Sequence, residues 1–505
     1  MNAGTTSRRI AQRELESYLW GAATLLRGLI DAGDYKGYIF PLVFLKRISD
    51  VWDEEHSRAL ELYGGDVGLA DLPENHRFAI PRGAHWDDIR QTTRDIGGKL
   101  ISAMRAIEVA NPDTLTGVFG DADWTNKDLL SDIVLGDLVE HFSTRTLSVA
   151  NLPEDELGNG YEYLIRKFAD DSGHTAQEFY TNRTLVHLMT QMLDPQPGES
   201  VYDPTCGTGG MLISCAAEVK RRGQEQRTLR LYGQERNYTT ASIAKMNLFL
   251  HGVEDGRIAH GDTLTTPAFI DPGGRLRRFD VVLANPPYSI KAWNRAAFAT
   301  DPYGRNIWGV PPQGRADYAF FQHIAASLKP STGRAAILFP HGVLFRQEEK
   351  ALRERLVRSG LLESVIGLGP GLFYNSPMEA VVVTLRAGRP AEQTKHVLFI
   401  NAVDLVARER AQSFLRDIDQ ATILDAYQRC VNIPGLATIA MVEQIASNDF
   451  SLALPLYVAV HPQRQGNRRT ENGLEEAVIA WCAAADAADA AVTEVITMLR
   501  PKAQQ

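Results

Sequence analysis

The residues Asn285, Pro286, Pro287 and Tyr288 follow an apolar run, Val281–Ala284, which predicts a strand buried on both faces. Asn285 offers a side-chain carbonyl, and Pro286 offers a backbone carbonyl without an N–H group. Two such acceptors would bind both N–H groups of a conjugated planar amine and make its nitrogen reactive toward a methyl group. Tyr288 would stack on a flat substrate such as an extruded nucleobase. The alternative is a plain Asn-Pro turn that ends the strand.

A glycine-rich turn follows another expected strand, residues 199–203, and leads into an apolar helix, residues 211–220. Glycines let a backbone approach a ligand closely, and helix N-terminal N–H groups favour an anionic group. The glycines do not match the dinucleotide pattern G-x-G-x-x-G, and an acid precedes them, where it would repel a pyrophosphate. The turn therefore favours a cationic, amino-acid-like ligand such as S-adenosylmethionine. Its candidate ligand-binding residues are Asp203, Thr205, Cys206, Gly207 and Gly209.

Two further acids end the next expected strands, residues 229–235 and 257–262. Glu235 could accept both ribose hydroxyls of the cofactor, and Asp262 could accept from the adenine amine. Strands and helices alternate from residue 194 to residue 385, which predicts a doubly wound α/β sheet with parallel order throughout. A Gly-, Pro-, Trp- and Arg-rich loop, residues 288–317, is expected to bind a ligand because it lies beside the Asn285 motif. An Arg-rich helix is expected over residues 405–415, followed by an irregular region.

The sheet is expected to lie between other parts of the chain. Helical spacing of apolar residues predicts an N-terminal helical domain over residues 1–150, a catalytic domain over 151–460, and a basic linker with an apolar-striped helix over 461–505. The basic residues Arg8, Arg9, Lys46 and Arg47 either contact phosphates or lie on solvated helix faces. The C-terminal helix either binds a partner or packs on the chain's own catalytic domain.

Length, net charge and cysteine content limit the classes of function that the chain can have. The 505-residue chain should form two or three domains, and its net charge of −9 argues against a large non-specific surface for polyanions. The four cysteines have no metal-ligand spacing, so we expect a reducing cytoplasm and no structural metal. No signal peptide is evident, and the longest apolar run, residues 38–45, is too short to span a membrane.

With these motifs in order, the chain resembles the DNA-methylating subunit of type I restriction–modification systems, a group of adenine-N6 methyltransferases. The residues that carry the resemblance lie at 178–183, 202–210, 233–235, 246–252, 284–288, 316–323, 333–345 and 448–455. The resemblance implies that the target adenine binds at residues 285–288 and that Glu235 holds the cofactor ribose. It also implies a cofactor pocket lined by Glu178, Phe179, Tyr180, Thr181, Asn182, Arg183 and residues 205–207. The chain departs from the family at Asn182, where proline is usual, and at residues 376–379, where a glycine-containing turn is common.

The resemblance further implies double-stranded DNA as substrate, a separate specificity subunit that binds two copies of this chain, and possibly a restriction subunit. No second unit long enough to read base edges follows the catalytic motifs, which agrees with a separate specificity subunit. Three alternatives remain: a protein-glutamine methyltransferase, since a glutamine amide is also a planar amine; a cytosine-N4 methyltransferase; and an inactive scaffold. The flanking domains argue against the first, and intact Asp203, Glu235 and Asn285 argue against the last.

Overall fold

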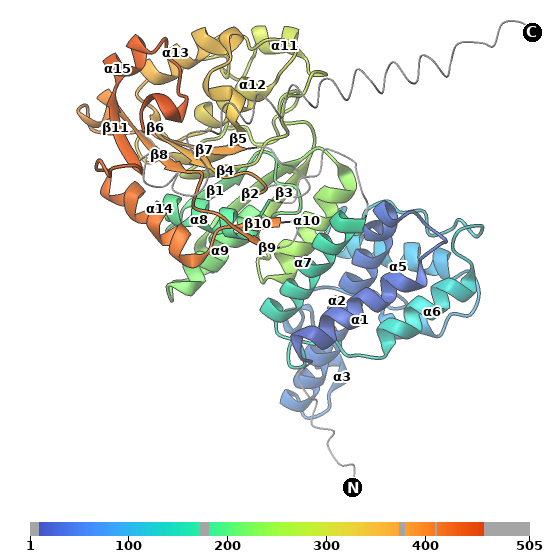
Figure 1. Cartoon of the computed structure of the whole chain (residues 1–505). Helices are drawn as coiled ribbons and strands as arrows, with labels where there is room; N and C mark the ends of the chain where they lie inside the picture. Colours follow the sequence, from blue (N-terminus) through green and yellow to red (C-terminus); the bar gives the residue numbers. More distant parts are fainter. Residues whose placement is uncertain (1–9, 172–180, 373–378, 410–411, 459–505) are drawn as a thin grey trace, which may run out of the picture.

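The computed structural model describes residues 10–171, 181–372, 379–409 and 412–458. A helical part formed by the first third of the chain lies beside a larger α/β part built around one sheet (Figure 1). Within those four ranges, no helix combines the length and the apolar character needed to cross a membrane.

The helical part has one apolar core. Its helices are α1 (Gln12–Leu25), α2 (Tyr35–Leu62), α3 (Val67–Ala70), α4 (Trp86–Arg90), α5 (Ile96–Ala110), α6 (Asp132–Ser143) and α7 (Glu154–Asp171). Leu157, Tyr161 and Leu164 of α7 belong to this core, so the core continues past residue 150. Met246 and Leu250 of α10 (Tyr238–Leu250) also belong to it, which joins the helical part to the α/β part.

The basic pair in α2 is internal. Lys46 pairs with Asp50, and Arg47 donates to the backbone carbonyls of Leu147 and Leu152. Lys46 is 5% exposed and Arg47 is 2% exposed, so neither of our two interpretations of these residues, phosphate contact or solvated face, is correct. Arg47 joins α2 to the segment that precedes α7.

The α/β part contains a nine-stranded sheet in the order β11-β8-β6-β7-β5-β4-β1-β2-β3. Its strands are β1 (Ser200–Asp203), β2 (Arg230–Glu235), β3 (Arg257–His260), β4 (Val281–Ala284), β5 (Arg334–Pro340), β6 (Leu362–Leu368), β7 (Ala380–Arg386), β8 (His396–Ala402) and β11 (Ala437–Met441). The first five strands are mutually parallel, as predicted. Because β4 and β1 are adjacent and parallel, their carboxyl ends bring Asn285 and Asp203 to the same edge.

Alternate residues of β4 contact different helical layers. Val281 and Leu283 pack with α8 (Arg183–Leu193), α9 (Gly210–Arg221) and α14 (Asp417–Arg429) on one face. Val282 and Ala284 pack with α12 (Asp317–Ala326), α13 (Lys350–Arg358) and α15 (Val442–Ser447) on the other. Each of the four residues is 0% exposed, which confirms the prediction of a strand buried on both faces.

The expectation of parallel order over residues 194–385 was wrong at β7, and the sheet continues beyond that range to an antiparallel strand that the sequence did not predict. β7 lies antiparallel between β5 and β6, and β11 lies antiparallel to β8. Only residues 369–379 connect β6 to β7, too few for the crossover that a parallel neighbour requires, whereas an antiparallel return needs only a short connection.

The helix expected over residues 405–415 was also wrong. Two short strands, β9 (Ala407–Glu409) and β10 (Gln412–Phe414), pair there in antiparallel order. Ser413 N donates to Gly371 O at 3.0 Å, so contacts with a distant turn outweigh the weak helical propensity of the segment. The region beyond it, expected to be irregular, contains α14, β11 and α15.

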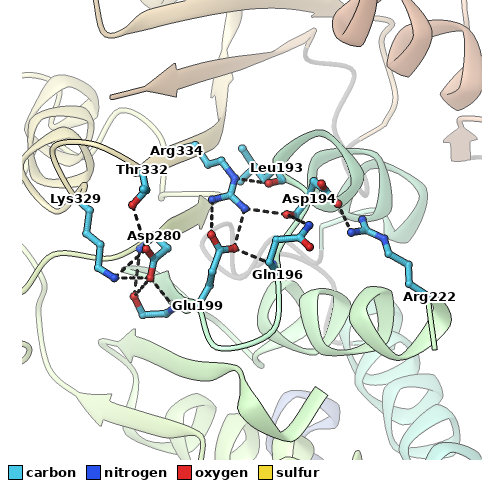
Figure 2. Close-up of polar contacts among 10 residues, drawn as sticks. Leu193, Asp194, Gln196, Glu199, Arg222, Asp280, Lys329, Thr332 and Arg334 are labelled. Carbon is cyan, nitrogen blue, oxygen red and sulfur yellow. Dashed lines mark hydrogen bonds and ion pairs between the residues drawn. The ribbon is translucent and has the colours of Figure 1, made fainter. Parts of the chain in front are cut away.

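A polar network ties together the amino ends of β1, β4 and β5 (Figure 2). Asp280 accepts from Lys329 at 2.7 and 2.8 Å and from Ser200 N at 2.9 Å. Arg334 forms a bidentate pair with Glu199, with N···O distances of 2.8 and 2.9 Å. This edge is opposite to the one that holds Asn285 and Asp203, and its carboxylates are engaged by cations and backbone amides.

Candidate active site

A cavity of about 620 Å³ opens at the carboxyl ends of β1 and β4, within the size range of small-molecule sites. Asp203 and Asn285 both line it, as does the face of α9 that follows the glycine turn. Part of the lining comes from α7, through Asp155, Asn159 and Glu162. The sequence did not predict that contribution, because α7 lies in the core of the helical part.

Asp203 ends β1 and is 2% exposed. Its Oδ1 accepts from Thr205 N at 3.0 Å, which fixes the carboxylate at the start of the turn. Burial, partly offset by the Thr205 N–H and reinforced by the nearby charge of Glu235, raises the pKa of Asp203 to about 7. A buried carboxylate with a raised pKa is suited to a cationic ligand, which would restore its charged form.

Glu235 ends β2 and supports the same turn. Its Oε2 accepts from Gly207 N at 3.0 Å, and its Oε1 accepts from Asn237 N at 2.8 Å. Gly207 has a φ of +52°, and open space lies where a side chain would begin, so ligand atoms can approach this backbone. Glu235 does not line the cavity itself, but it accepts a hydrogen bond from Gly207, which does.

Of the other predicted residues, some line the cavity and the others lie outside its lining. Thr205 and Cys206 line the cavity, and burial raises the pKa of the Cys206 thiol well above its usual value, which keeps it uncharged. Gly209 does not line the cavity; it precedes α9 at a φ of +82° and closes the turn through Gly209 N to Cys206 O at 2.8 Å. Asp262 lies outside the lining, with its Oδ1 accepting from Leu264 N at 2.9 Å.

Asn285 is held by neighbours on both sides of its amide. Its Nδ2 donates to Thr181 Oγ1 at 2.8 Å, and its Oδ1 accepts from Tyr288 Oη at 2.5 Å. Burial, with a further contribution from Asp317, raises the pKa of Tyr288 well above its usual value, so the hydroxyl remains a donor. The carbonyl predicted to receive an amine N–H therefore points toward the Tyr288 hydroxyl in this arrangement.

The family resemblance implied that residues 178–183 line the cofactor pocket. The structure describes this segment from residue 181 onward, so Glu178, Phe179 and Tyr180 lie outside the described residues. Thr181 and Arg183 line the cavity, and Arg183 pairs with Glu162 of α7. Asn182 does not line it. Its Oδ1 accepts from Thr184 N at 2.9 Å and caps α8, while its Nδ2 donates to Ser413 O at 2.9 Å. Asn182 thus joins the segment to β10.

Two residues at the C-terminal end of α10, Asn247 within the helix and His251 directly after it, line the cavity without having been singled out by the sequence. Asn247 is 1% exposed; its Nδ2 donates to Thr208 O at 2.9 Å, and its buried Oδ1 has no hydrogen-bond partner in the described part of the chain. His251, one helical turn later, bonds Asn247 O through Nδ1 at 2.9 Å. Both lie in the motif at 246–252. The sequence interpretation selected residues at the ends of predicted strands, so it did not single out residues in or directly after a helix.

These residues fit S-adenosylmethionine. A buried acid suits its amino group, the glycine turn at the start of α9 suits its carboxylate, and Asn247 Oδ1 is a buried acceptor that still needs a donor. Within the described ranges, no three His, Cys, Asp or Glu side chains are placed to hold a metal. The sheet and the turn define an S-adenosylmethionine-dependent methyltransferase.

Comparisons with known proteins identify the family. The N-6 DNA methylase family model matches residues 153–466, and the HsdM N-terminal domain model matches residues 15–142. The type I restriction enzyme MjaIX methylase subunit of Methanocaldococcus jannaschii is 27% identical, over 90% of this chain and 85% of that protein. The HindI methylase subunit of Haemophilus influenzae is 30% identical, over 76% of this chain and 90% of that protein.

A solved structure agrees with these relatives. The type I restriction-modification system methyltransferase subunit from Streptococcus thermophilus superposes with a TM-score of 0.77 at 31% identity, covering 89% of this chain and all of that one. The chain therefore belongs to the N-6 DNA methylase family and is similar to the methylase subunits of type I restriction enzymes.

Proposed function

We propose that this chain is the modification subunit of a type I restriction–modification complex. It transfers a methyl group from S-adenosylmethionine to N6 of adenine in double-stranded DNA, at a site chosen by a separate specificity subunit. The observation that carries the chemistry is the Asn285 amide, which lies at the end of a central strand, lines the same cavity as Asp203 and is fixed by Thr181. The family and the full-length relatives support the substrate class.

Asn285 acts on the target amine through its carbonyl oxygen. Binding of a base displaces the Tyr288 hydroxyl from Asn285 Oδ1, which then accepts an N–H from the amine, while Thr181 keeps the amide in one orientation. Pro286 presents a backbone carbonyl as the second acceptor, and Tyr288 stacks on the base. When bound, the cofactor supplies an electrophilic methyl group. Asp203, Glu235, Gly207 and Arg183 would hold the cofactor, with Asp262 proposed at the adenine.

Substitution of Asn285 by alanine tests this chemistry. We expect turnover to fall about 10²-fold or more, because a preorganised acceptor is lost, while cofactor affinity changes little. The measurement is transfer of labelled methyl groups to DNA by the complex purified with the tagged chain, together with calorimetry of cofactor binding. Near-normal turnover of Asn285→Ala would disprove the acceptor role.

The partner and the compartment are further parts of the proposal. Residues 461–505 provide the specificity-subunit contact, with two copies of this chain per specificity subunit, and a restriction subunit joins when restriction occurs. The net charge of −9 leaves little capacity for tight unaided binding to DNA, which supports a shared interface. The cysteines of the described part are free thiols, as a reducing cytoplasm would keep them.

A further inference from the structure

A carboxylate outside the cavity holds the backbone directly after Tyr288. Asp317, the first residue of α12, is 1% exposed, and its Oδ1 accepts from Ser289 N at 2.7 Å. Ser289 has a φ of +52°, a left-handed conformation that a residue with a side chain rarely adopts without support. A second contact, Ala316 N to Ile290 O at 3.1 Å, keeps the start of α12 against the same turn. The direction in which the chain leaves Tyr288 is thus set by α12.

The second oxygen of the Asp317 carboxylate also has a hydrogen-bond partner. Arg346 Nη1 donates to Asp317 Oδ2 at 2.7 Å and lies 3.5 Å from the fully buried Glu349. Arg353, 1% exposed, donates through Nη1 to Arg346 O at 2.7 Å and through Nε to Phe450 O at 3.0 Å. The motifs at 316–323 and 448–455, which the cofactor site leaves unexplained, are therefore joined through Arg346 and Arg353.

We propose that Asp317 is a positioning residue for methyl transfer, which holds the left-handed turn at Ser289 so that the Tyr288 side chain and the Asn285 carbonyl keep their places at the target base. This inference rests on the proposed function. Asp317 touches neither the cavity nor the Asn285 amide; it holds the turn through the hydrogen bond from Ser289 N, and its charge also acts on the Tyr288 hydroxyl. Arg346 orients the carboxylate through its hydrogen bond to Oδ2, and it acts one step further from the base.

The chain offers a matched control directly before β4. Asp280 precedes β4 at the opposite edge of the sheet; like Asp317 it is buried, accepts a backbone N–H and pairs with a cation (Figure 2). Removing either carboxylate should destabilise the fold to a similar degree. Only the loss of Asp317 disturbs the turn that follows Tyr288.

The experiment measures methyl transfer to DNA by the complex purified with Asp317→Ala, Asp317→Asn or Asp280→Asn. We expect Asp317→Ala to lower kcat about 100-fold, as a misplacement of about 1 Å can do, with cofactor affinity unchanged. Asp317→Asn should lose less, because its amide oxygen can still accept from Ser289 N. Asp280→Asn should keep the wild-type kcat per folded molecule at temperatures below its own unfolding.

Several outcomes would overturn the inference. One is a kcat for Asp317→Ala within about threefold of wild type; another is a loss matched by Asp280→Asn at equal folded fraction, measured by circular dichroism. A fall in cofactor affinity that accounts for the slower transfer would also overturn it. If Asp317→Ala does not fold, Arg346→Lys serves as the second variant, and an unchanged kcat there would overturn the support proposed for Arg346. A wild-type complex that methylates no DNA would overturn the proposed function and the inference with it.

Discussion

Replacing Asp203 by asparagine should remove a pH dependence from cofactor binding. The substitution keeps an oxygen that can accept from Thr205 N, so the turn is preserved while the charge is lost. In the wild-type protein burial raises the pKa of Asp203 to about 7. The cationic cofactor binds best to the ionised carboxylate, so its affinity should rise as pH increases toward and through 7.

The size of the effect follows from the ionised fraction of Asp203. With a pKa of about 7, that fraction rises from roughly 3% at pH 5.5 to about half at pH 7, so the dissociation constant should fall about 15-fold. An α-amino group titrates near pH 7.7–8.0, so the ligand's own charge changes little over this range. At pH 7 the loss of a charge-assisted contact in Asp203→Asn should cost about 1.5–3 kcal/mol of binding free energy.

Isothermal titration calorimetry in buffers of different ionisation enthalpy is the assay. At pH 6 cofactor binding to the wild type should release close to one proton, because about nine-tenths of Asp203 is protonated before binding. His251 also lines the cavity, and burial lowers its pKa, so it contributes mainly at the acid end. Asp280→Asn should behave as wild type. If Asp203→Asn kept the 15-fold change and the proton release, Asp203 would not be the group that meets the cofactor amine.

Three other variants test the remaining contacts. Glu235→Ala should weaken cofactor binding by about 1.5–3 kcal/mol per lost charged hydrogen bond, and calorimetry showing an unchanged affinity would remove Glu235 from the site. Burial opposes ionisation of Asp280, but Lys329 and Ser200 outweigh it and lower its pKa to about 2. Its contribution to stability is therefore complete above its unfolded pKa of about 3.8 and is lost as pH falls through 2, so the difference in melting temperature between wild type and Asp280→Asn should shrink between pH 4 and pH 2. Deleting residues 468–505 should leave a folded, cofactor-binding chain that no longer co-purifies with its specificity subunit; full assembly and site-specific methylation by the truncated chain would contradict this.

Most of the proposed site residues could be located from the sequence because the signals for them are local. A strand buried on both faces needs consecutive apolar residues, and the turn after it needs proline or glycine, so Asn285 and the Asp203 turn were visible without any tertiary contact. Parallel strands then end at one edge, and the structure confirms that Asp203 and Asn285 line one cavity there. Helical spacing likewise predicted the N-terminal helices.

Only the tertiary structure decided which neighbours of these residues line the cavity and which support the backbone. Asn182 and Thr181 are adjacent in the sequence, yet one caps α8 and reaches Ser413 while the other holds the Asn285 amide. The wall formed by α7, the insertion of β7 and the strand pair at residues 407–414 all depend on contacts between distant segments. Such contacts leave no periodic signal in the chain, because the free energy that selects them comes from burial and hydrogen bonding between segments that fold together.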